Sequence, residues 1–321
     1  MEENIHDTWS IDDIVRHAAK CRRDQPSAAI MESVGSYRLQ FDRQSHAASG
    51  AGVTIFTFHA TVPETHAEID YIDVKHNHHQ FDYEGLSDHL IWSSTSFAKA
   101  DLYFITSVDS EKVFDQGNIK TIHLHVDRAK PMLERVKAML GYVESDAFAN
   151  DTVFLDTDAF PNRRLEQVFD DSFDIGVTYR LTPGYMPLNE GVIFCSARDK
   201  AAVRRFFRSY LATYEALMSD PVIAAYYGDV TRWRGGQLSL NAVAPPVDRH
   251  ADGVVALDGV AFRFLPCDLF NYWVEAPPRP DGTELDDKFI LHLKGDSKPM
   301  LSHVAIYQAD RLKRLTLQPL A

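Results

Sequence analysis

Cysteine is scarce in this chain, and the three cysteines stand far apart. Cys21, Cys195 and Cys267 offer neither a disulfide framework nor the close spacing of a zinc site. Cys195 ends the apolar run 192–195, so we expect a buried small side chain there. Unpaired thiols of this kind favour a reducing compartment.

Excess positive charge and long hydrophobic runs are also lacking. The 321 residues include 46 acidic and 33 basic side chains, and the formal net charge of −13 disfavours a general nucleic-acid binder. No run approaches the roughly 20 apolar residues of a transmembrane segment. The acidic, polar start (residues 1–4) does not resemble a signal peptide. We therefore expect no nucleic-acid partner, no transmembrane segment and a cytoplasmic location, while export without a signal peptide stays open.

The chain divides into a short preface and a large domain. Residues 1–48 predict a helical N-terminal extension, in which Ser10 is the expected helix N-cap because an acid, Asp13, follows three residues later. Residues 45–52 are small and polar and predict a linker. Residues 49–321 are expected to form one domain of the α/β class.

Short β-branched and aromatic runs alternate with longer amphipathic stretches from residue 53 onward. The predicted strands are 53–58, 102–107, 121–126, 152–155, 175–179, 191–195, 262–265 and 289–293. The predicted helices are 85–98, 131–140, 164–169, 199–218 and 237–243, and Gly141 is the expected stop of the second. This alternation, with several nearly all-apolar strands, predicts a mainly parallel sheet flanked by helices.

Two carboxylates follow the predicted strand 152–155. In an extended segment, Asp156 and Asp158 would project to the same side, where they could hold Mg²⁺ or Mn²⁺ against phosphate oxygens. Ligands gather at the carboxyl ends of strands in open α/β sheets. The alternative is that both acids are turn or cap residues.

A second polar loop follows the apolar run 289–291. His292 offers an imidazole ligand, Gly295 permits close backbone approach, and Lys294 and Lys298 bring positive charge suited to phosphate. Taken alone, this loop is more typical of a strand-end turn with solvated lysines.

Together these segments resemble the retaining glycosyltransferases of family 8 and their relatives with the GT-A fold. There, an Asp-x-Asp after a core strand binds the metal, and a late His-x-x-Gly-x-x-Lys-Pro loop completes the metal shell and grips the diphosphate. Asp156 and Asp158 match the first motif, and His292, Gly295, Lys298 and Pro299 match the second. Met300 stands where an aromatic residue is frequent.

Further segments support the resemblance over roughly residues 50–300. The run 186–194, with Asn189 and Glu190, looks like the strand that borders the donor sugar. Gln237 matches the Gln of an Asp-Gln helix start, but Gly236 replaces the Asp that commonly contacts sugar hydroxyls, which puts the donor sugar in question. Residues 54–60 resemble the first strand, so Phe58, His59 and Ala60 are expected to meet the nucleotide base and ribose.

The resemblance implies a metal-dependent transferase that moves a sugar from a nucleotide diphosphate to an unidentified glycan, lipid or protein. UDP is the usual nucleotide of this family. Mn²⁺ or Mg²⁺ is the implied cofactor. Thr157, Arg180 and Lys294 would join the donor contacts, Gln237, Glu190 and Asn189 are the candidate catalytic residues, and Glu190 would be the base of an inverting enzyme. Same-face attack with retention is favoured because Gln237 is a poor nucleophile.

Two other functions remain open at this point. A sugar-phosphate nucleotidyltransferase would carry a Gly-rich basic loop after the first strand, and residues 59–63 offer none. A non-catalytic carbohydrate- or nucleotide-binding module on the same fold is disfavoured by the intact set of Asp156, Asp158 and His292.

Overall fold

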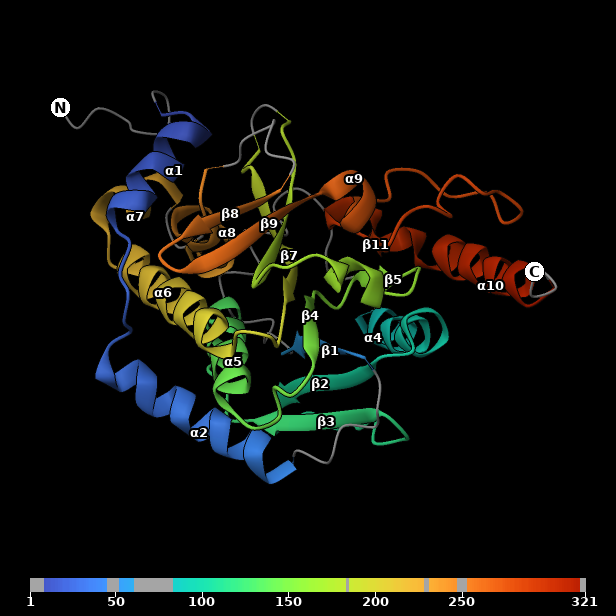
Figure 1. Ribbon diagram of the computed structural model, residues 1–321, viewed down its shortest axis with the longest axis horizontal. Helices are drawn as coiled ribbons and strands as arrows, with labels where there is room; N and C mark the ends of the chain where they lie inside the picture. The colour runs from blue at the N-terminus through green and yellow to red at the C-terminus, as the bar shows by residue number, and fades with distance from the viewer. Residues whose placement is uncertain are drawn as a thin grey trace.

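A computed structural model describes residues 9–44, 52–60, 83–182, 185–227, 231–246 and 253–317. Most of the predicted linker, 45–52, lies outside these residues. The described part centres on an eight-stranded sheet of order β3-β2-β1-β4-β7-β6-β9-β8 (Figure 1). Its strands are β1 (Val53–His59), β2 (Asp101–Ser107), β3 (Ile119–Leu124), β4 (Asp151–Leu155), β6 (Ile175–Tyr179), β7 (Leu188–Cys195), β8 (Val254–Leu257) and β9 (Val260–Pro266).

The sheet is mainly parallel, which confirms the predicted α/β architecture. β1 pairs in parallel with β2 and β4, β2 with β3, and β6 with β9. β7 lies antiparallel between β4 and β6, and β8 is an antiparallel edge strand beside β9. β1, β4 and β7 are buried along almost their whole length, as expected for strands covered on both faces.

Helices cover both faces of the sheet. Four of them pack through one hydrophobic cluster on the first face: α2 (Ala28–Gln44), α5 (Pro131–Glu144), α6 (Lys200–Met218) and α8 (Thr231–Val243). A second cluster on the other face joins α4 (Tyr83–Ser93) and α10 (Leu301–Leu317). Figure 1 shows α2, α5 and α6 on one side and α4 and α10 on the other.

A small second sheet lies beside α4 and α10. It consists of β10 (Tyr272–Trp273), β11 (Ile290–His292) and β5 (Ala159–Pro161), in that order. β5 follows β4 after a short turn and pairs antiparallel with β11, so that His292 lies opposite Ala159. Residues more than 130 positions apart in the chain are thereby fixed at one edge of the main sheet.

The N-terminal extension is helical where the structure describes it. α1 (Ile11–Lys20) begins with the predicted capping box, in which the Ser10 hydroxyl accepts from the Asp13 N–H and the Asp13 carboxylate accepts from the Ser10 N–H. Its buried Ile14 and Ala18 pack in a third cluster with residues of α8 and of α7 (Pro221–Tyr227).

Three predictions about helices are wrong. Gly141 does not end a helix: α5 continues to Glu144, and a Cβ at Gly141 would lie 2.9 Å from the Cβ of Tyr37, so its lack of a side chain lets α2 pack closely. Gln237 does not start a helix but lies inside α8. The predicted helix 164–169 is a 3₁₀ turn, Glu166–Asp170.

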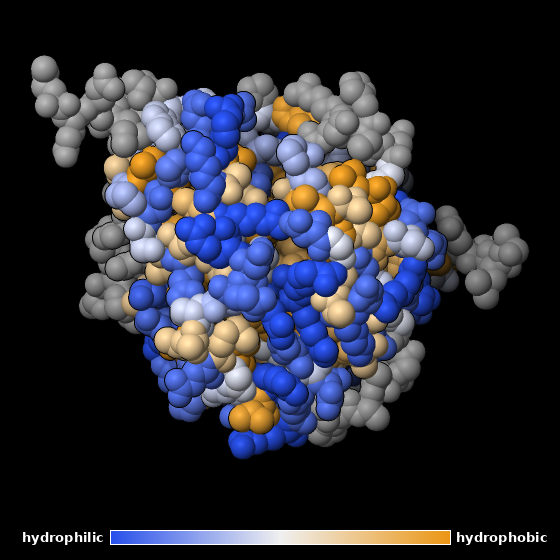
Figure 2. All heavy atoms as spheres, turned by 60° about the vertical axis from the view of Figure 1, so that its left-hand side comes forward, coloured by the Kyte–Doolittle hydropathy of each residue, from blue (hydrophilic) through white to orange (hydrophobic). Residues whose placement is uncertain are grey.

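The face that carries α1, α6 and α7 is mostly hydrophilic, with scattered hydrophobic spots (Figure 2). None of the described helices combines the length and apolarity that a membrane span requires.

Candidate metal and phosphate site

Asp156, Asp158 and His292 converge at the carboxyl edge of the main sheet. His292 Nε2 lies 3.0 Å from Asp158 Oδ1 and 3.9 Å from Asp156 Oδ2. One ligand atom from each residue fits within 4.8 Å of the others, close enough for a single divalent ion. The sequence motifs predicted this convergence, although the local geometry differs from the prediction.

The two acids stand on a tight turn and not on an extended segment. The Ala159 N–H donates to the Asp156 carbonyl at 3.1 Å, which closes the turn between β4 and β5 and places Thr157 at its half-buried centre. The Leu293 N–H donates to the Asp158 carbonyl at 2.9 Å and ties the turn to β11. The pairing of β5 with β11 therefore aims both carboxylates at His292.

A chain of hydrogen bonds fixes the orientation of the His292 ring. The Asn271 amide group donates to Asn189 Oδ1 at 2.8 Å and to Thr178 Oγ1 at 2.9 Å, which leaves Asn271 Oδ1 as an acceptor. His292 Nδ1 lies 2.8 Å from that oxygen and so carries the proton that it donates. Nε2 is then the ring nitrogen that faces the two acids.

This arrangement calls for a positive charge between His292 and the acids. In the neutral ring, the Nε2 lone pair would face carboxylate oxygens, so either a second proton or a metal ion must lie between them. Burial lowers the pKa of His292, which opposes the second proton despite the nearby Asp158. Burial also disfavours ionised Asp158, but Lys298 and His292 outweigh it and lower the pKa of this carboxyl.

Gly191 leaves the space that the cluster occupies. A Cβ at this position would lie 2.6 Å from both Asp156 Oδ2 and His292 Cε1, closer than atoms can pack. The register of β7 against β6 shifts between Val177 and Thr178, and this irregularity accommodates Gly191 beside the acids. The oxygen and nitrogen donors and this side-chain-free cradle fit Mn²⁺ or Mg²⁺.

Cationic side chains surround the cluster. Lys298 Nζ lies 2.7 Å from Asp158 Oδ2, so the predicted phosphate ligand pairs with a metal-site acid. Among the described residues, Arg180 and Lys294 form no ion pair, and Arg180 Nε has no hydrogen-bond partner. Burial lowers the pKa of Lys294, and nearby Arg180 lowers it further. These two half-buried cations, neither of which forms an ion pair with a described residue, are a candidate anion site.

Gly295 begins the turn that carries Lys298. Its φ is +51°, in the left-handed region, and no other atom would meet a Cβ there within 4 Å. Glycine adopts this conformation without the cost that other residues bear.

Glu190 is buried on the face of the sheet that α5, α6 and α8 cover. The Tyr210 hydroxyl donates to its carboxylate at 2.8 Å, and Arg135 Nη1 lies 3.5 Å from the same oxygen. Burial raises the pKa of Glu190 to about 7, against the lowering effect of Arg135. Arg135 also contacts Asp156 Oδ1 at 2.9 Å and thereby links Glu190 to the group of Asp156, Asp158 and His292.

The structure explains why glycine, and not the Asp of the family motif, stands at position 236. A Cβ at Gly236 would lie 2.2 Å from Glu190 Oε2, so the buried carboxylate of Glu190 occupies the volume that an Asp at 236 would need. The Gln237 backbone also hydrogen-bonds to Glu190, and the Gln237 side chain is half-buried.

The end of β1 forms an aromatic wall. Phe58 is buried, while His59 and Ala60 are half-buried. The His59 ring lies 6.1 Å from that of Tyr83 and 6.3 Å from that of Phe104. Burial lowers the pKa of His59 to about 4, so it is a neutral, flat surface at physiological pH.

Sequence reasoning missed Asn271 and Arg135. Asn271 stands in a segment with no local pattern, and only the folded structure shows that it holds His292. Arg135 left no clear signal either, because Glu134 and Lys137 beside it are typical of the solvated side of an amphipathic helix.

Solved structures with a similar chain path are glycosyltransferases. One acts in glycosylation of the major capsid of PBCV-1, with 13% identity, a TM-score of 0.43 and coverage of 78% of this chain and 98% of that one. The bifunctional WbbM has 10% identity, a TM-score of 0.49 and coverage of 84% and 52%. The galactosyltransferase LgtC has 12% identity, a TM-score of 0.41 and coverage of 83% and 98%. No family model and no curated protein matches the sequence.

Proposed function

We propose that this chain is a metal-dependent glycosyltransferase that transfers a sugar from a nucleotide diphosphate donor. The donor we propose is a UDP-sugar, and the acceptor is an unidentified glycan, lipid or protein. The observation that carries the proposal is the meeting of Asp156, Asp158 and His292 beside Lys294 and Arg180, of which Arg180 has a buried Nε without a hydrogen-bond partner among the described residues. A cation site next to an anion site is what a metal-bound diphosphate requires.

Each group has a role in this proposal. Asp156, Asp158 and His292 would hold Mn²⁺ or Mg²⁺, which neutralises charge on the departing diphosphate. Lys294 and Arg180 bind phosphate oxygens, and their enclosed setting strengthens that attraction. Phe58, His59 and Ala60 offer a flat surface for the base, and Thr157 lies in the turn between the two acids.

Retention is the stereochemical outcome that this site favours. An inverting enzyme needs a carboxylate base open to the acceptor, but Glu190 is only 5% exposed and is held by Tyr210 and Arg135. Asn189 is held by Asn271 and the Gly191 N–H. Attack from the face of the leaving group needs no protein base, and Gln237 is then a positioning group for the donor sugar.

The test combines binding with turnover. Thermal melting with UDP should show stabilisation that depends on Mn²⁺, and a screen of nucleotide sugars with Mn²⁺ should reveal slow donor hydrolysis. Asp158→Asn should abolish both responses, whereas Asp268→Asn, an exposed acid of the short helix Cys267–Phe270, should leave them unchanged.

Other outcomes would point elsewhere. Pyrophosphate release from a nucleoside triphosphate and a sugar phosphate would indicate a nucleotidyltransferase. UDP binding without any turnover would indicate a binding module, and no response to any nucleotide diphosphate would overturn the proposal.

A further inference from the structure

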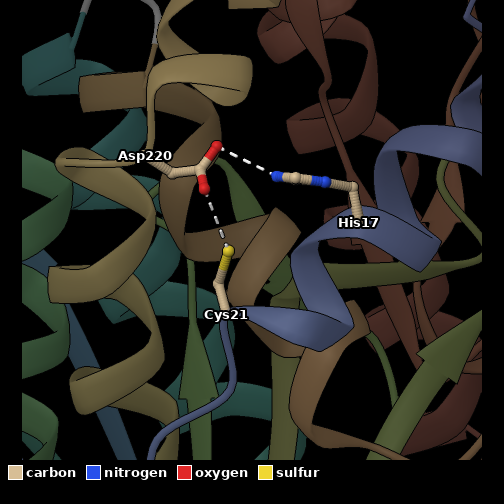
Figure 3. Close-up of side chains that lie close together, drawn as sticks. All are labelled: His17, Cys21 and Asp220. Atoms are coloured by element: carbon tan, nitrogen blue, oxygen red, sulfur yellow. Dashed lines mark hydrogen bonds and ion pairs between the residues drawn. The ribbon is translucent and has the colours of Figure 1, made fainter.

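A second group of metal-ligating side chains lies far from the sheet edge. His17 and Cys21 are four residues apart at the end of α1, so both project to the same side of this helix. Asp220, which immediately precedes α7, lies against them from a distant part of the chain. Figure 3 shows the Asp220 carboxylate between the two, with one oxygen toward each.

The three side chains are already close to a coordinating arrangement. His17 Nε2 lies 3.0 Å from Asp220 Oδ1, and Cys21 Sγ lies 3.4 Å from Asp220 Oδ2. One ligand atom of each residue lies within 4.8 Å of the others. Asp220 is held in place because its Oδ1 accepts the N–H groups of Val222 and Ile223, each at 3.0 Å. Small side-chain rotations would bring all three atoms onto one ion.

We propose that His17, Cys21 and Asp220 form a second metal site, for Zn²⁺ or a related thiophilic divalent ion, which fastens α1 to the start of α7. A thiolate, an imidazole and a carboxylate are the ligand types that zinc takes, and the sulfur favours zinc over Mn²⁺ or Mg²⁺. The cluster at Asp156, Asp158 and His292 has no sulfur, so the two sites differ in the ions they prefer.

Solvent reaches two of the three side chains, so water can supply a fourth ligand. The side chains of His17 and Asp220 are 18% and 17% exposed, whereas Cys21 is buried beneath them. Three protein ligands plus water complete a tetrahedral zinc shell. When the sulfur–zinc bond forms, the thiol proton that Cys21 donates to Asp220 passes to solvent, and Asp220 changes from acceptor to ligand.

The same residues do not fit a nucleophilic cysteine. Such a thiol needs a base that takes its proton, with an acid behind the base. Here the acid lies between the thiol and the imidazole, and burial together with Asp220 raises the pKa of Cys21 to about 11. The ordering suits shared coordination and opposes thiolate formation without a metal.

Cobalt distinguishes this site from the first. Co²⁺ added to the reduced, metal-free full chain should give a near-ultraviolet sulfur-to-cobalt absorption band, which Zn²⁺ removes by competition. The band should persist in Asp158→Asn, which lacks the first site. It should vanish in Cys21→Ser and remain in Cys267→Ser, whose buried thiol lies elsewhere.

Stability gives an independent readout. In the Asp158→Asn background, which lacks the first site, Zn²⁺ at about a hundred times its dissociation constant should raise the Tm of the full chain by about 5 °C. In the same background, His17→Gln keeps a side-chain donor for Asp220 but loses the imidazole, and its Tm should not respond to zinc. Absence of the band in the wild-type chain, or its survival in Cys21→Ser, would show that the three side chains form only a hydrogen-bonded clasp and would overturn the proposal.

Discussion

At the scale of single residues, the partners of His292 decide how this side chain acts. Its Nδ1 donates to Asn271, and Asn271 is in turn oriented by Asn189 and Thr178. The proposed ligand atom, Nε2, is thus selected by residues that do not contact the ion. Sequence motifs reveal His292 but not Asn271, because the hydrogen bond joins segments that only the fold brings together.

Replacement of Asn271 tests this selection. In Asn271→Ala the ring loses its acceptor, so Nδ1 and Nε2 compete for the proton, and we expect Mn²⁺ affinity to fall about 10–100-fold. A Mn²⁺ titration followed by electron paramagnetic resonance measures this. Thr178→Val, which removes one acceptor of the Asn271 amide and the donor to the Asn189 carbonyl but leaves Asn271 Oδ1 facing His292, should cost less. Equal affinity in Asn271→Ala and wild type would contradict the role given to Asn271.

Gly191 sets the room available to the same cluster. In Gly191→Ala, the new methyl group would push Asp156 and His292 apart, so we expect at least about tenfold weaker Mn²⁺ binding, the lower part of the range for overpacking. Isothermal titration calorimetry measures the affinity. Gly35→Ala, where no atom lies within 4 Å of the added methyl, is the matched control. Unchanged binding in Gly191→Ala would mean that the cradle is wider than described.

At the scale of elements, the close packing of α2 against α5 explains why Gly141 does not end a helix, and it leads to a testable prediction. Gly141 followed an amphipathic run, which is typical of a helix end, yet α5 continues because α2 lies against that glycine. In Gly141→Ala, the methyl group would meet Tyr37 and the backbone of Arg38, which should lower the free energy of unfolding by about 1–3 kcal/mol.

Urea denaturation compares Gly141→Ala with Gly35→Ala in the interior of α2. The second change meets no neighbour and should stabilise the chain by up to about 1 kcal/mol, because alanine favours helix over glycine. A stable Gly141→Ala protein would imply that α2 can move away from α5 without cost.

Elements with a strong period were predictable from the sequence, and those defined by distant partners were not. β6 coincides with its predicted range of 175–179, and α6 begins one residue later than predicted. β5 and β10 are too short to leave a pattern, and they form strands only because β11 lies between them. The Asp156–Asp158 turn has the same origin, since its shape follows from the pairing of β5 with β11. His17 and Cys21 have helical spacing, but Asp220 joins them only in the fold.

At the scale of the whole molecule, two half-buried histidines should make stability depend on pH. Burial lowers the pKa of His59 and of His89 to about 4 from a usual value near 6.5. The unfolded chain therefore binds more protons than the folded one between these values, so stability falls as pH drops from about 6.5 toward 4. Urea midpoints at pH 7 and pH 4.5 measure the loss.

A variant separates this effect from general acid unfolding. His89 stacks on Trp92 and bonds to Gln308, so His89→Gln retains a polar contact but cannot titrate. Its midpoint should fall less between pH 7 and pH 4.5 than that of the wild-type chain. An identical fall of the urea midpoint in both proteins would show that His89 does not contribute to the pH dependence of stability.

The pairing of β5 with β11 means that the candidate metal site is completed late in the synthesis of the chain. His292 reaches the two acids only through a strand that the ribosome completes after most of the main sheet has been synthesised. A nascent or truncated polypeptide that ends before Ile290 would carry both acids without their partner. If the proposed function is right, donor turnover would therefore begin only when the C-terminal segment has docked.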